Sequence, residues 1–368
     1  MLVRPRFHDL TVSDVRRETG DCVSVAFKAP PALADAYRFV QGQYLTLRRD
    51  FDGEDLRRSY SICSGRDEGE LRIAVKAVLD GRFSSWLNND LRPGIALSVM
   101  TPQGRFHHPL QPDGRGRYAL FAAGSGITPV ISVARTVLAS EPESEVMLFY
   151  GNRTAADVIF RDALDDLKSR HLGRFSLLHI LSAEDQEAPL CHGRIDAAKT
   201  RALMEAFGPA ENFDEALVCG PGDMAEAVSE ALMATGMMAS RIRTERFTGN
   251  PGQSAAPRIA LPETGSGLRA AGPAETAKIT VVLDGARRHF VMGFNDENII
   301  DAGHRHGLDL PFSCKGGMCC TCRARLVSGQ VDMQQNYSLE PWELKAGFVL
   351  TCQSRPLTHE VVLDYDAL

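Results

Sequence analysis

The sequence predicts a multidomain chain: a small antiparallel β-barrel over residues 1–112, an α/β doubly wound domain over 113–248 and a β-rich domain over 277–368. Short runs that alternate apolar and polar residues fill the first segment, which is typical of a barrel of short strands. Strand and helix patterns alternate in the second segment and indicate a parallel sheet with crossover helices. A stretch rich in Pro, Gly, Ala and Ser over 249–276 predicts an interdomain linker.

The composition is that of an ordinary globular protein, with 44% hydrophobic and 24% charged residues in a chain of 368. The net charge of −6 gives no general reason to expect nucleic-acid binding. Nine cysteines, four of them in one C-terminal motif and the rest scattered, do not have the pattern of a disulfide framework. The N-terminus lacks the apolar run of a signal peptide, and no window approaches the roughly 18 continuous apolar residues of a membrane span. We therefore expect a cytoplasmic protein that does not enter a membrane.

Four runs of period two predict the barrel strands, and one patch of helical period predicts a short helix. The strands are expected at His8–Arg16, Asp21–Ala29, Gln43–Arg49 and Leu71–Leu79, and the helix at about Ser84–Leu91.

Two clusters in the barrel segment suggest a bound flavin nucleotide. In Arg58-Ser59-Tyr60-Ser61, expected just after a strand, the arginine suits a phosphate, the tyrosine offers a flat face to a flavin ring and the second serine can hydrogen-bond a ring nitrogen. The turn Gly81-Arg-Phe83-Ser84 opens the predicted helix, and N–H groups at a helix N-terminus form a natural pyrophosphate site. Taken alone each pattern is weak, because a tyrosine on a strand is usually a packing residue.

The second domain opens with a predicted strand at Tyr118–Ala122, followed by Gly124-Ser-Gly126-Ile-Thr128-Pro129 and an apolar helix. Thr128 suits the N-cap of this helix and Pro129 its first position. Pro129 stands where the full dinucleotide fingerprint has its third glycine. The turn still presents N–H groups and a helix dipole to a pyrophosphate.

The rest of the second domain continues the alternation. Strands are expected at Val146–Tyr150, Phe175–Ser182, Ala216–Cys219 and Arg241–Thr248, and helices at about Thr154–Arg170 and Asp223–Thr235. The first of these strands runs into Gly-Asn-Arg153, at the place where an NAD site usually carries an acidic residue. A guanidinium suits a 2′-phosphate, so Arg153 favours NADPH over NADH.

The third domain combines predicted strands at Ile279–Asp284 and His289–Met292 with a helix at Asn298–His306, which leads into a cysteine motif. Cys314, Cys319 and Cys322 form a C-x4-C-x2-C run.

A gap of 29 residues then separates Cys322 from Cys352, which completes the plant-type spacing for a [2Fe–2S] cluster. A structural zinc site is the alternative, but such sites usually combine two close pairs, and Cys352 has no close companion. Cys320, a fifth thiol in the loop, is expected to be a small packed side chain and not a ligand.

On these motifs the chain resembles the ferredoxin–NADP reductase family fused to a plant-type ferredoxin, over nearly its whole length apart from the linker. The motifs that are similar are the flavin signature Arg58-Ser-Tyr-Ser61, the FAD pyrophosphate turn Gly81-x-x-Ser84-x-x-Leu87, and the nicotinamide-nucleotide motifs Gly124-x-Gly126-x-x-Pro129 and Cys219-Gly220-Pro221. The resemblance implies a β-grasp fold for 277–368 and the cofactors FAD, NADPH and a [2Fe–2S] cluster.

The domain order, together with Tyr150-Gly-Asn-Arg153 and Glu245-Arg-Phe247, looks most like the reductase subunits of the phenylacetyl-CoA epoxidases of aerobic phenylacetate degradation. The resemblance therefore implies a multisubunit di-iron oxygenase as the electron acceptor.

The expected relay runs from NADPH to FAD, to the cluster and then to the oxygenase, because a hydride carries two electrons, a cluster accepts one at a time and a flavin can do both. The resemblance implies that Ser61 tunes the flavin N5 region, that Cys219 lies by the nicotinamide and that Phe247 covers the flavin until the nicotinamide displaces it. From the residues alone, Cys219 is equally well a buried thiol and Phe247 a core side chain.

Two alternatives stay open. FMN and NADH in place of FAD and NADPH would describe the reductases of Rieske aromatic-ring dioxygenases, which can share this domain order. In a different class, the C-terminal domain would be a redox-sensing or docking module, and slow NADPH oxidation would be incidental.

Overall fold

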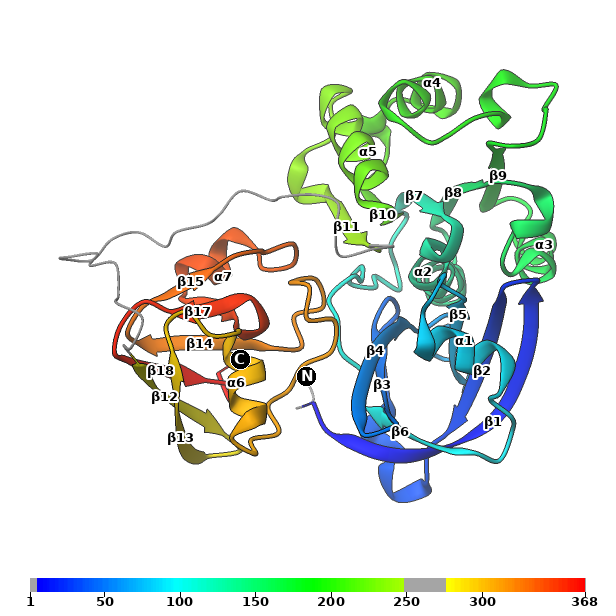
Figure 1. The fold of residues 1–368 in the computed structure, drawn as a ribbon. Coiled ribbons are helices and arrows are strands. Elements are labelled where there is room, and N and C mark those ends of the chain that lie inside the picture. The colour runs from blue at the N-terminus through cyan, green and yellow to red at the C-terminus, as the bar shows by residue number, and fades with distance from the viewer. Residues whose placement is uncertain (1–4, 248–275, 368) are drawn as a thin grey trace. The chain divides into compact units, whose positions relative to one another are not determined.

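The computed structural model describes residues 5–247 and 276–367 (Figure 1). Its contacts divide the chain into two compact units, one that contains the two N-terminal sheets and one that contains the C-terminal sheets. The linker predicted at 249–276 lies outside the described residues, apart from Thr276, which begins a strand. The domain boundaries drawn from the sequence stay predictions.

Six strands form the first sheet, in the order β4-β3-β6-β1-β2-β5. Their bounds are β1 Phe7–Thr19, β2 Cys22–Lys28, β3 Tyr44–Phe51, β4 Glu54–Ser61, β5 Leu71–Lys76 and β6 Ala96–Met100, and helix α1 spans Arg82–Asn89. An antiparallel bridge between Ile62 and Ile73 joins the end of β4 to β5, so the sheet closes into a barrel. The predicted barrel is confirmed.

The sequence analysis expected the flavin signature just after a strand, but the structure places it inside β4. The reason is a tight hairpin between β3 and β4. Asp52 and Gly53 take positive φ values of 56° and 87°, which a two-residue hairpin of this kind requires and an Asp-Gly pair accommodates. The strand therefore restarts at once and runs up to Ser61.

Five parallel strands form the second sheet, in the order β11-β10-β7-β8-β9. Their bounds are β7 Arg117–Ala123, β8 Glu145–Asn152, β9 Phe175–Leu181, β10 Glu215–Gly220 and β11 Ile242–Arg246. Helices α2 (Ile127–Ser140) and α3 (Arg161–Arg170) pack on one face, and α4 (Ala197–Phe207) and α5 (Gly222–Ala234) pack on the other. This is the predicted doubly wound arrangement, and α2 lies on the face that meets the barrel, where Ser132 Oγ donates to the carbonyl of Ser64 at 2.7 Å.

Three helices of this domain differ from expectation. The helix predicted at Thr154–Arg170 is split, because buried Phe160 takes a φ of 63° before α3 begins. Helix α4 was not predicted; the Asp196 carboxylate caps it by accepting from the Lys199 N–H at 2.7 Å. Helix α2 begins at Ile127 with Gly126 as its N-cap, so the N-cap assignment of Thr128 was wrong.

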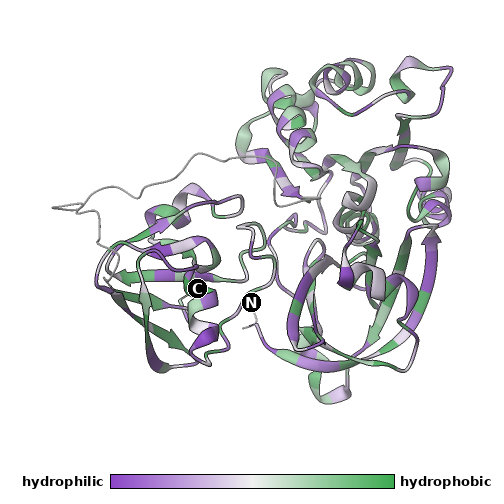
Figure 2. Ribbon diagram, in the orientation of Figure 1, coloured by the Kyte–Doolittle hydropathy of each residue, from purple (hydrophilic) through white to green (hydrophobic). Residues whose placement is uncertain are grey.

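The C-terminal unit has a five-stranded sheet in the order β13-β12-β18-β14-β16 and a two-stranded sheet β15-β17. The bounds are β12 Thr276–Leu283, β13 Ala286–Gly293, β14 Arg323–Ser328, β15 Val331–Met333, β16 Phe348–Leu350, β17 Ser354–Pro356 and β18 Glu360–Asp364, with helices α6 Ile299–Arg305 and α7 Pro341–Lys345. Only β12 and β18 pair in parallel within the five-stranded sheet. The apolar residues of these strands enclose one core (Figure 2), and the arrangement is the expected β-grasp.

No helix among residues 5–247 and 276–367 is long and apolar enough to cross a membrane.

Candidate functional site: a junction between barrel and nucleotide-binding sheet

Ser61, the last residue of β4, meets the far end of the nucleotide-binding sheet. Its side chain lies near the carboxyl group of Glu245 in β11 and acts on the ionisation of that group. Glu245 is in turn the register partner of Cys219 in the parallel strand β10. Ser61 and Cys219, predicted on separate domains, are thus brought together through a carboxyl group that the sequence analysis quoted in a motif but did not name as a site residue.

The environment of this junction keeps its acids protonated. Burial raises the pKa of Glu245 to about 8, and the nearby Ser61 side chain offsets only part of that effect. Its second oxygen, Oε2, accepts no hydrogen bond from the described residues. Burial, together with the charge that Glu245 would carry, also raises the pKa of Cys219, so this thiol does not ionise at neutral pH. A buried carboxyl oxygen that accepts no hydrogen bond from the described residues is a candidate partner for a bound ligand.

The glycine-rich turn packs directly against Cys219. Gly124 has a φ of 52°, and a Cβ on Gly126 would lie 2.2 Å from the Cys219 carbonyl oxygen, so neither position suits a larger residue. The Tyr150 hydroxyl donates to the Gly124 carbonyl at 3.0 Å and fixes the turn from β8. The N-terminus of α2 therefore lies beside the end of β10, as a pyrophosphate site at a helix N-terminus requires.

The remaining predicted nucleotide residues take structural positions around this turn. Thr128 Oγ1 donates to the Ser125 carbonyl at 3.0 Å, and Pro129 is buried in the first turn of α2. Pro221 is the N-cap of α5, and the N–H of Phe247 donates to the Gly220 carbonyl at 3.0 Å. The Phe247 side chain is half-buried against the α2 core, close to the junction.

The predicted FAD turn has the expected geometry, with one difference in how its side chains are used. Gly81 is the N-cap of α1, and no described side chain caps it. The Ser84 hydroxyl accepts from the Val78 N–H and donates to the Gly81 carbonyl, each at 3.1 Å, so it shapes the turn. The Phe83 side chain is buried, with its ring centroid 6.4 Å from that of Tyr60, which leaves only its N–H for a phosphate.

The β4 signature fits a flavin. Tyr60 and Ser59 are half-buried, Ser61 is buried and Arg58 is exposed, so the strand carries an accessible cation and a partly accessible aromatic side chain. The donor set therefore suits a phosphate-bearing flavin.

Arg153 is exposed just beyond β8, but it is not the only charged residue at that edge. The Glu184 carboxylate accepts from the Ala155 N–H at 2.9 Å. Asp157 accepts from the Thr154 N–H at 3.0 Å. Asp157 and Glu184 thus place two carboxylates near Arg153, the cation that was predicted to bind a 2′-phosphate. Glu184 was missed in the sequence analysis because it follows β9 and is distant from Arg153 in sequence.

The cysteine loop 314–322 is held in shape by left-handed residues and by a second loop. Lys315, Gly317 and Cys320 have φ values of 49°, 76° and 53°. The Gly317 carbonyl accepts from the N–H of Tyr337 at 3.0 Å and from the hydroxyl of Ser338 at 3.1 Å. Cys320 is half-buried against the core of this unit, which places its side chain among apolar neighbours.

The four predicted ligands lie as two neighbouring pairs, Cys314 with Cys319 and Cys322 with Cys352, and in each pair the partner thiol is the largest influence on the pKa of Cys314 or Cys322. Across the described ranges, no three His, Cys, Asp or Glu side chains are gathered closely enough to hold a metal ion by themselves. The hydrogen bond from Cys319 and those from nearby backbone N–H groups, including Gly316, lower the pKa of Cys314 to about 6. Four sulfur donors, backbone amides directed at one of them and a loop that curls through left-handed residues fit a [2Fe–2S] cluster.

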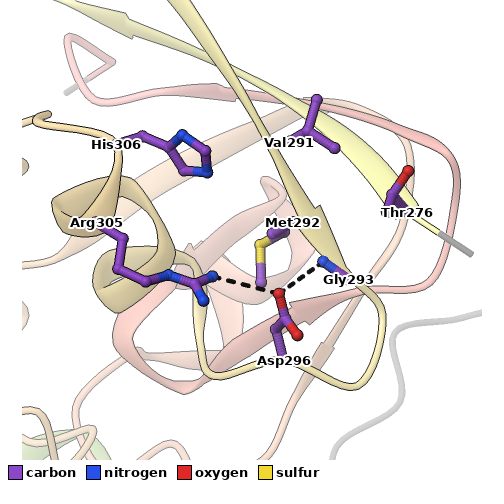
Figure 3. A pocket seen from close by; sticks show the side chains of 7 residues that line it. All are labelled: Thr276, Val291, Met292, Gly293, Asp296, Arg305 and His306. Carbon is purple, nitrogen blue, oxygen red and sulfur yellow. Dashed lines mark hydrogen bonds and ion pairs between the residues drawn. The ribbon is translucent and has the colours of Figure 1, made fainter. Parts of the chain in front are cut away.

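A separate hollow of about 460 Å³ opens on the C-terminal unit between β13 and α6 (Figure 3). Asp296 accepts there from the Gly293 N–H at 2.8 Å and from Arg305 at 3.3 Å, so its charge is already satisfied. None of the predicted site residues lines this hollow.

Family models match all three folded segments. They describe an oxidoreductase FAD-binding domain over residues 9–108, an oxidoreductase NAD-binding domain over 120–230 and a 2Fe-2S iron-sulfur cluster binding domain over 281–357. These matches establish FAD, NAD(P)H and a [2Fe–2S] cluster as the cofactors.

Whole-chain relatives share this organisation. The chain is 46% identical over 361 residues to a subunit of the 1,2-phenylacetyl-CoA epoxidase of Escherichia coli K12, and the match covers 98% of each chain. It is 33% identical to the ferredoxin reductase component of 3-ketosteroid-9-alpha-monooxygenase of Rhodococcus rhodochrous, over 97% of this chain and 96% of that one. Among solved structures, phthalate dioxygenase reductase shares the fold with a TM-score of 0.59 at 24% identity, over 97% of this chain and 98% of that one.

Three matched domains in the same order, a buried junction between a flavin strand and a nucleotide-binding sheet, and four paired thiols lead to one conclusion: the chain belongs to the family of oxygenase reductases that join FAD-binding, NAD-binding and [2Fe–2S] domains in a single oxidoreductase.

Proposed function

We propose that this reductase passes electrons from NADPH through FAD and the [2Fe–2S] cluster to a multisubunit di-iron oxygenase, the phenylacetyl-CoA epoxidase of aerobic phenylacetate degradation. The acceptor is inferred from the 46% identity to a chain of that epoxidase over 98% of both sequences. The observation that carries the internal relay is the junction of Ser61, Glu245 and Cys219, because it brings the flavin strand to the end of the nucleotide-binding sheet.

The flavin would be held by the β4 signature and the α1 turn. Arg58 would neutralise a phosphate, Tyr60 would stack on the ring system, and Ser61 would hydrogen-bond its N5 region. Ser59, Gly81, Phe83 and Ser84 would complete the site, the last three by shaping the turn and supplying its N–H groups. When bound, FAD supplies two-electron chemistry with the nicotinamide and one-electron chemistry with the cluster.

The nucleotide would lie across the glycine-rich turn and β10. Gly124, Gly126, Thr128 and Pro129 shape the N-terminus of α2 for its pyrophosphate. Cys219, with Gly220 and Pro221, would border the nicotinamide, and Phe247 would cover the flavin when the nucleotide is absent. Glu245 holds a proton on its buried carboxyl group, which keeps the junction neutral while it is shielded from water.

Cys314, Cys319, Cys322 and Cys352 would bind the cluster iron. All nine cysteines lie in the described residues and none forms a disulfide, which supports a reducing compartment and hence a cytoplasmic location. We also propose domain boundaries after residues 112, 248 and 276, since the family matches over 9–108, 120–230 and 281–357 fall inside them.

A second candidate differs in the nucleotide. The Glu184 carboxylate near Arg153 is the kind of group that binds a ribose 2′-hydroxyl, and it would repel a 2′-phosphate. NADH as the donor is therefore the alternative to NADPH. Arg153 still favours NADPH, since a guanidinium at the strand end gives a 2′-phosphate its charge partner.

An anaerobic titration of the purified holoprotein with NADPH, followed by absorbance and low-temperature EPR, tests the relay. We expect bleaching of the flavin band together with a rhombic EPR signal from the reduced cluster. Flavin bleaching without that signal, in protein that has its full iron content, would contradict the transfer to the cluster and favour a docking or sensing role for the C-terminal domain. Addition of the epoxidase oxygenase components should then reoxidise the cluster, whereas an unrelated oxygenase should not.

A further inference from the structure

A cluster of one basic and two aromatic side chains lies where helix α1 meets strand β3 of the barrel. The guanidinium of Arg49, in β3, lies over the Trp86 ring of α1, with 3.8 Å between its central carbon and the ring centroid. The Phe51 ring contacts both groups, at 5.4 Å from that carbon and 6.1 Å from the Trp86 centroid. All three side chains are half-buried, and none belongs to the proposed flavin, nucleotide or iron–sulfur residues.

Packing accounts for the two rings of this cluster but not for its cation. Phe51 and Trp86 both pack against the hydrophobic core of the barrel. The Nε atom of Arg49 is buried and has no hydrogen-bond partner among the described residues, and no described carboxylate pairs with this guanidinium. A desolvated N–H group without an acceptor is costly, so a half-buried guanidinium normally has an anion beside it. Arg49 therefore has donor capacity for a ligand.

The second cation near this cluster is already neutralised. Arg82, the first residue of α1, pairs with Asp52 at 3.0 Å and with Glu54 at 2.9 Å. These two carboxylates lie at the turn between β3 and β4, and their charge is offset by Arg82. Arg49 is thus the cation of this region that an anionic ligand can use.

The order of the proposed flavin residues along β4 indicates which ligand reaches this region. Ser61 is proposed for the N5 region of the flavin, Tyr60 for the ring system and Arg58 for a phosphate, so the nucleotide runs from the end of β4 back toward its beginning. A two-residue turn joins that beginning to β3, and Arg49 lies two residues before this strand ends. The adenosine monophosphate half of FAD, which follows the first phosphate, therefore extends toward Arg49.

Ring contacts connect Tyr60 to the cluster through α1. The Phe83 ring lies 6.4 Å from that of Tyr60 and 5.5 Å from that of Phe51, measured between centroids. Arg82 also donates to the Phe51 carbonyl at 3.3 Å, which ties the first turn of α1 to the end of β3. The turn proposed for the pyrophosphate thus lies between Tyr60 on one side and Arg49 on the other.

We infer that Arg49, held in place by Trp86, binds the second phosphate of FAD and thereby makes the site select FAD over FMN, which has only one phosphate. The inference rests on the proposed flavin site, in which Arg58 neutralises the first phosphate. Arg49 supplies the second cation, and a guanidinium suits a phosphate because it can donate two parallel hydrogen bonds. Trp86 is a positioning residue, since it contacts the guanidinium and not the flavin.

Flavin binding to the full-length protein tests this inference. Dilution of the FAD holoprotein, followed by the fluorescence of the released flavin, gives the Kd for FAD. The same measurement on protein dialysed against excess FMN gives the Kd for FMN. Arg49→Gln should raise the Kd for FAD about 10-fold, a typical effect of losing a hydrogen bond to a charged group, and should leave the Kd for FMN unchanged. The preference for FAD over FMN should fall by the same factor.

Arg117→Gln is the matched control. Arg117 also lies over an aromatic ring, that of Phe213 at 5.1 Å, but it belongs to β7 in the nucleotide-binding sheet. Both Kd values should stay at those of the wild type in this variant. A rise in the Kd for FAD in Arg117→Gln as large as that in Arg49→Gln would overturn the inference.

Substitutions of Trp86 test its positioning role. Trp86→Leu removes the ring under the guanidinium and should raise the Kd for FAD about threefold, as expected for the loss of one cation–π contact. Trp86→Phe keeps an aromatic face and should restore most of the affinity. The Kd for FMN should be unchanged in both variants, because a destabilised barrel would weaken the binding of both flavins alike.

Arg58→Gln separates failure of this inference from failure of the proposed flavin site. It should weaken the binding of both flavins, since each carries the first phosphate. An unchanged Kd for FAD in Arg49→Gln would overturn the inference, and so would an equal rise for FAD and FMN. If Arg58→Gln changed neither Kd, the proposed flavin site itself would be wrong. If it raised both while Arg49→Gln raised neither, only the role of Arg49 would be wrong.

Discussion

Ser61 lies near the carboxyl group of Glu245 although one ends a barrel strand and the other lies in the edge strand of the parallel sheet. The proximity brings a predicted flavin ligand next to a carboxyl group whose pKa is raised by burial. Because Cys219 is the register neighbour of Glu245, this is the place where the proposed flavin and nicotinamide sites would meet.

Replacement of Glu245 by Gln should change how stability depends on pH. A folded-state pKa raised from 4.5 to about 8 means that the stabilising contribution of this group is fully present below pH 4.5 and is lost as pH rises toward 8, by up to about 1.4 kcal/mol per pH unit. Gln cannot ionise, so Glu245→Gln should show none of this loss. Urea unfolding of both holoproteins at several pH values between these limits measures the difference. Parallel curves for the two proteins would show that the carboxyl group is not protonated in the folded state.

Gly126→Ala should disrupt nucleotide binding, because the added Cβ would lie 2.2 Å from the Cys219 carbonyl oxygen. We expect the KM for NAD(P)H in ferricyanide reduction to rise at least about 10-fold with flavin content unchanged, since the turn must shift away from the pyrophosphate. Gly173→Ala is the matched control, because no atom lies within 4 Å of its added Cβ. Equal kinetics in the two variants would mean that the turn is not part of the nucleotide site.

Cys322→Ser should separate the two halves of the relay. The variant is expected to lose cytochrome c reduction, which needs the cluster, and to keep NADPH–ferricyanide activity, which needs only the flavin. Steady-state assays with the two acceptors, alongside iron analysis, measure this. If both activities fell together while flavin content was maintained, electrons would not follow the proposed order.

The left-handed backbone at Cys320 carries a conformational cost that glycine would remove. With a φ of 53°, Cys320→Gly should stabilise the loop by about 1 kcal/mol, the typical cost of that region for a residue with a side chain. The measurement is the temperature at which the visible absorbance of the cluster is lost. Cys320→Ser removes the thiol but keeps the backbone cost, so its midpoint should stay near that of the wild type. A midpoint for Cys320→Ser as high as that for Cys320→Gly would assign the effect to the thiol.

Nucleotide preference should depend on the balance between Arg153 and Glu184. Arg153→Ala should raise the KM for NADPH about 10-fold and change that for NADH little, because only NADPH carries the phosphate that a guanidinium pairs with. Glu184→Gln should lower the KM for NADPH by removing a nearby negative charge. Initial rates with both nucleotides test this pair, and a loss confined to NADH in Arg153→Ala would favour NADH as the donor.

Local patterns in the sequence predicted most of the architecture, but they predicted little of the junction of Ser61, Glu245 and Cys219. Glycine-rich turns, strand periodicity and cysteine spacing depend on residues that are near one another in the chain, and they predicted the barrel, the doubly wound sheet and the iron–sulfur domain. The proximity of Ser61 to Glu245 joins strands that are distant in sequence, so no local period reports it.

Errors within elements each have a specific physical cause. Thr128 has the chemistry of an N-cap, yet the preceding Gly124–Gly126 turn starts the helix early and leaves the threonine inside it. The split before α3 arises because the Phe160 side chain is buried at a positive φ, a tertiary requirement that no propensity anticipates.

The order of strands in the parallel sheet also bears on the synthesis of this protein. All six residues of β10 are buried, and β11, the last strand of the sheet to emerge from the ribosome, covers its outer edge. A nascent or truncated chain that ends before Ile242 would expose the apolar strand β10 with unpaired backbone groups. Such fragments are expected to aggregate, so the short strand that carries Glu245 also protects the growing chain.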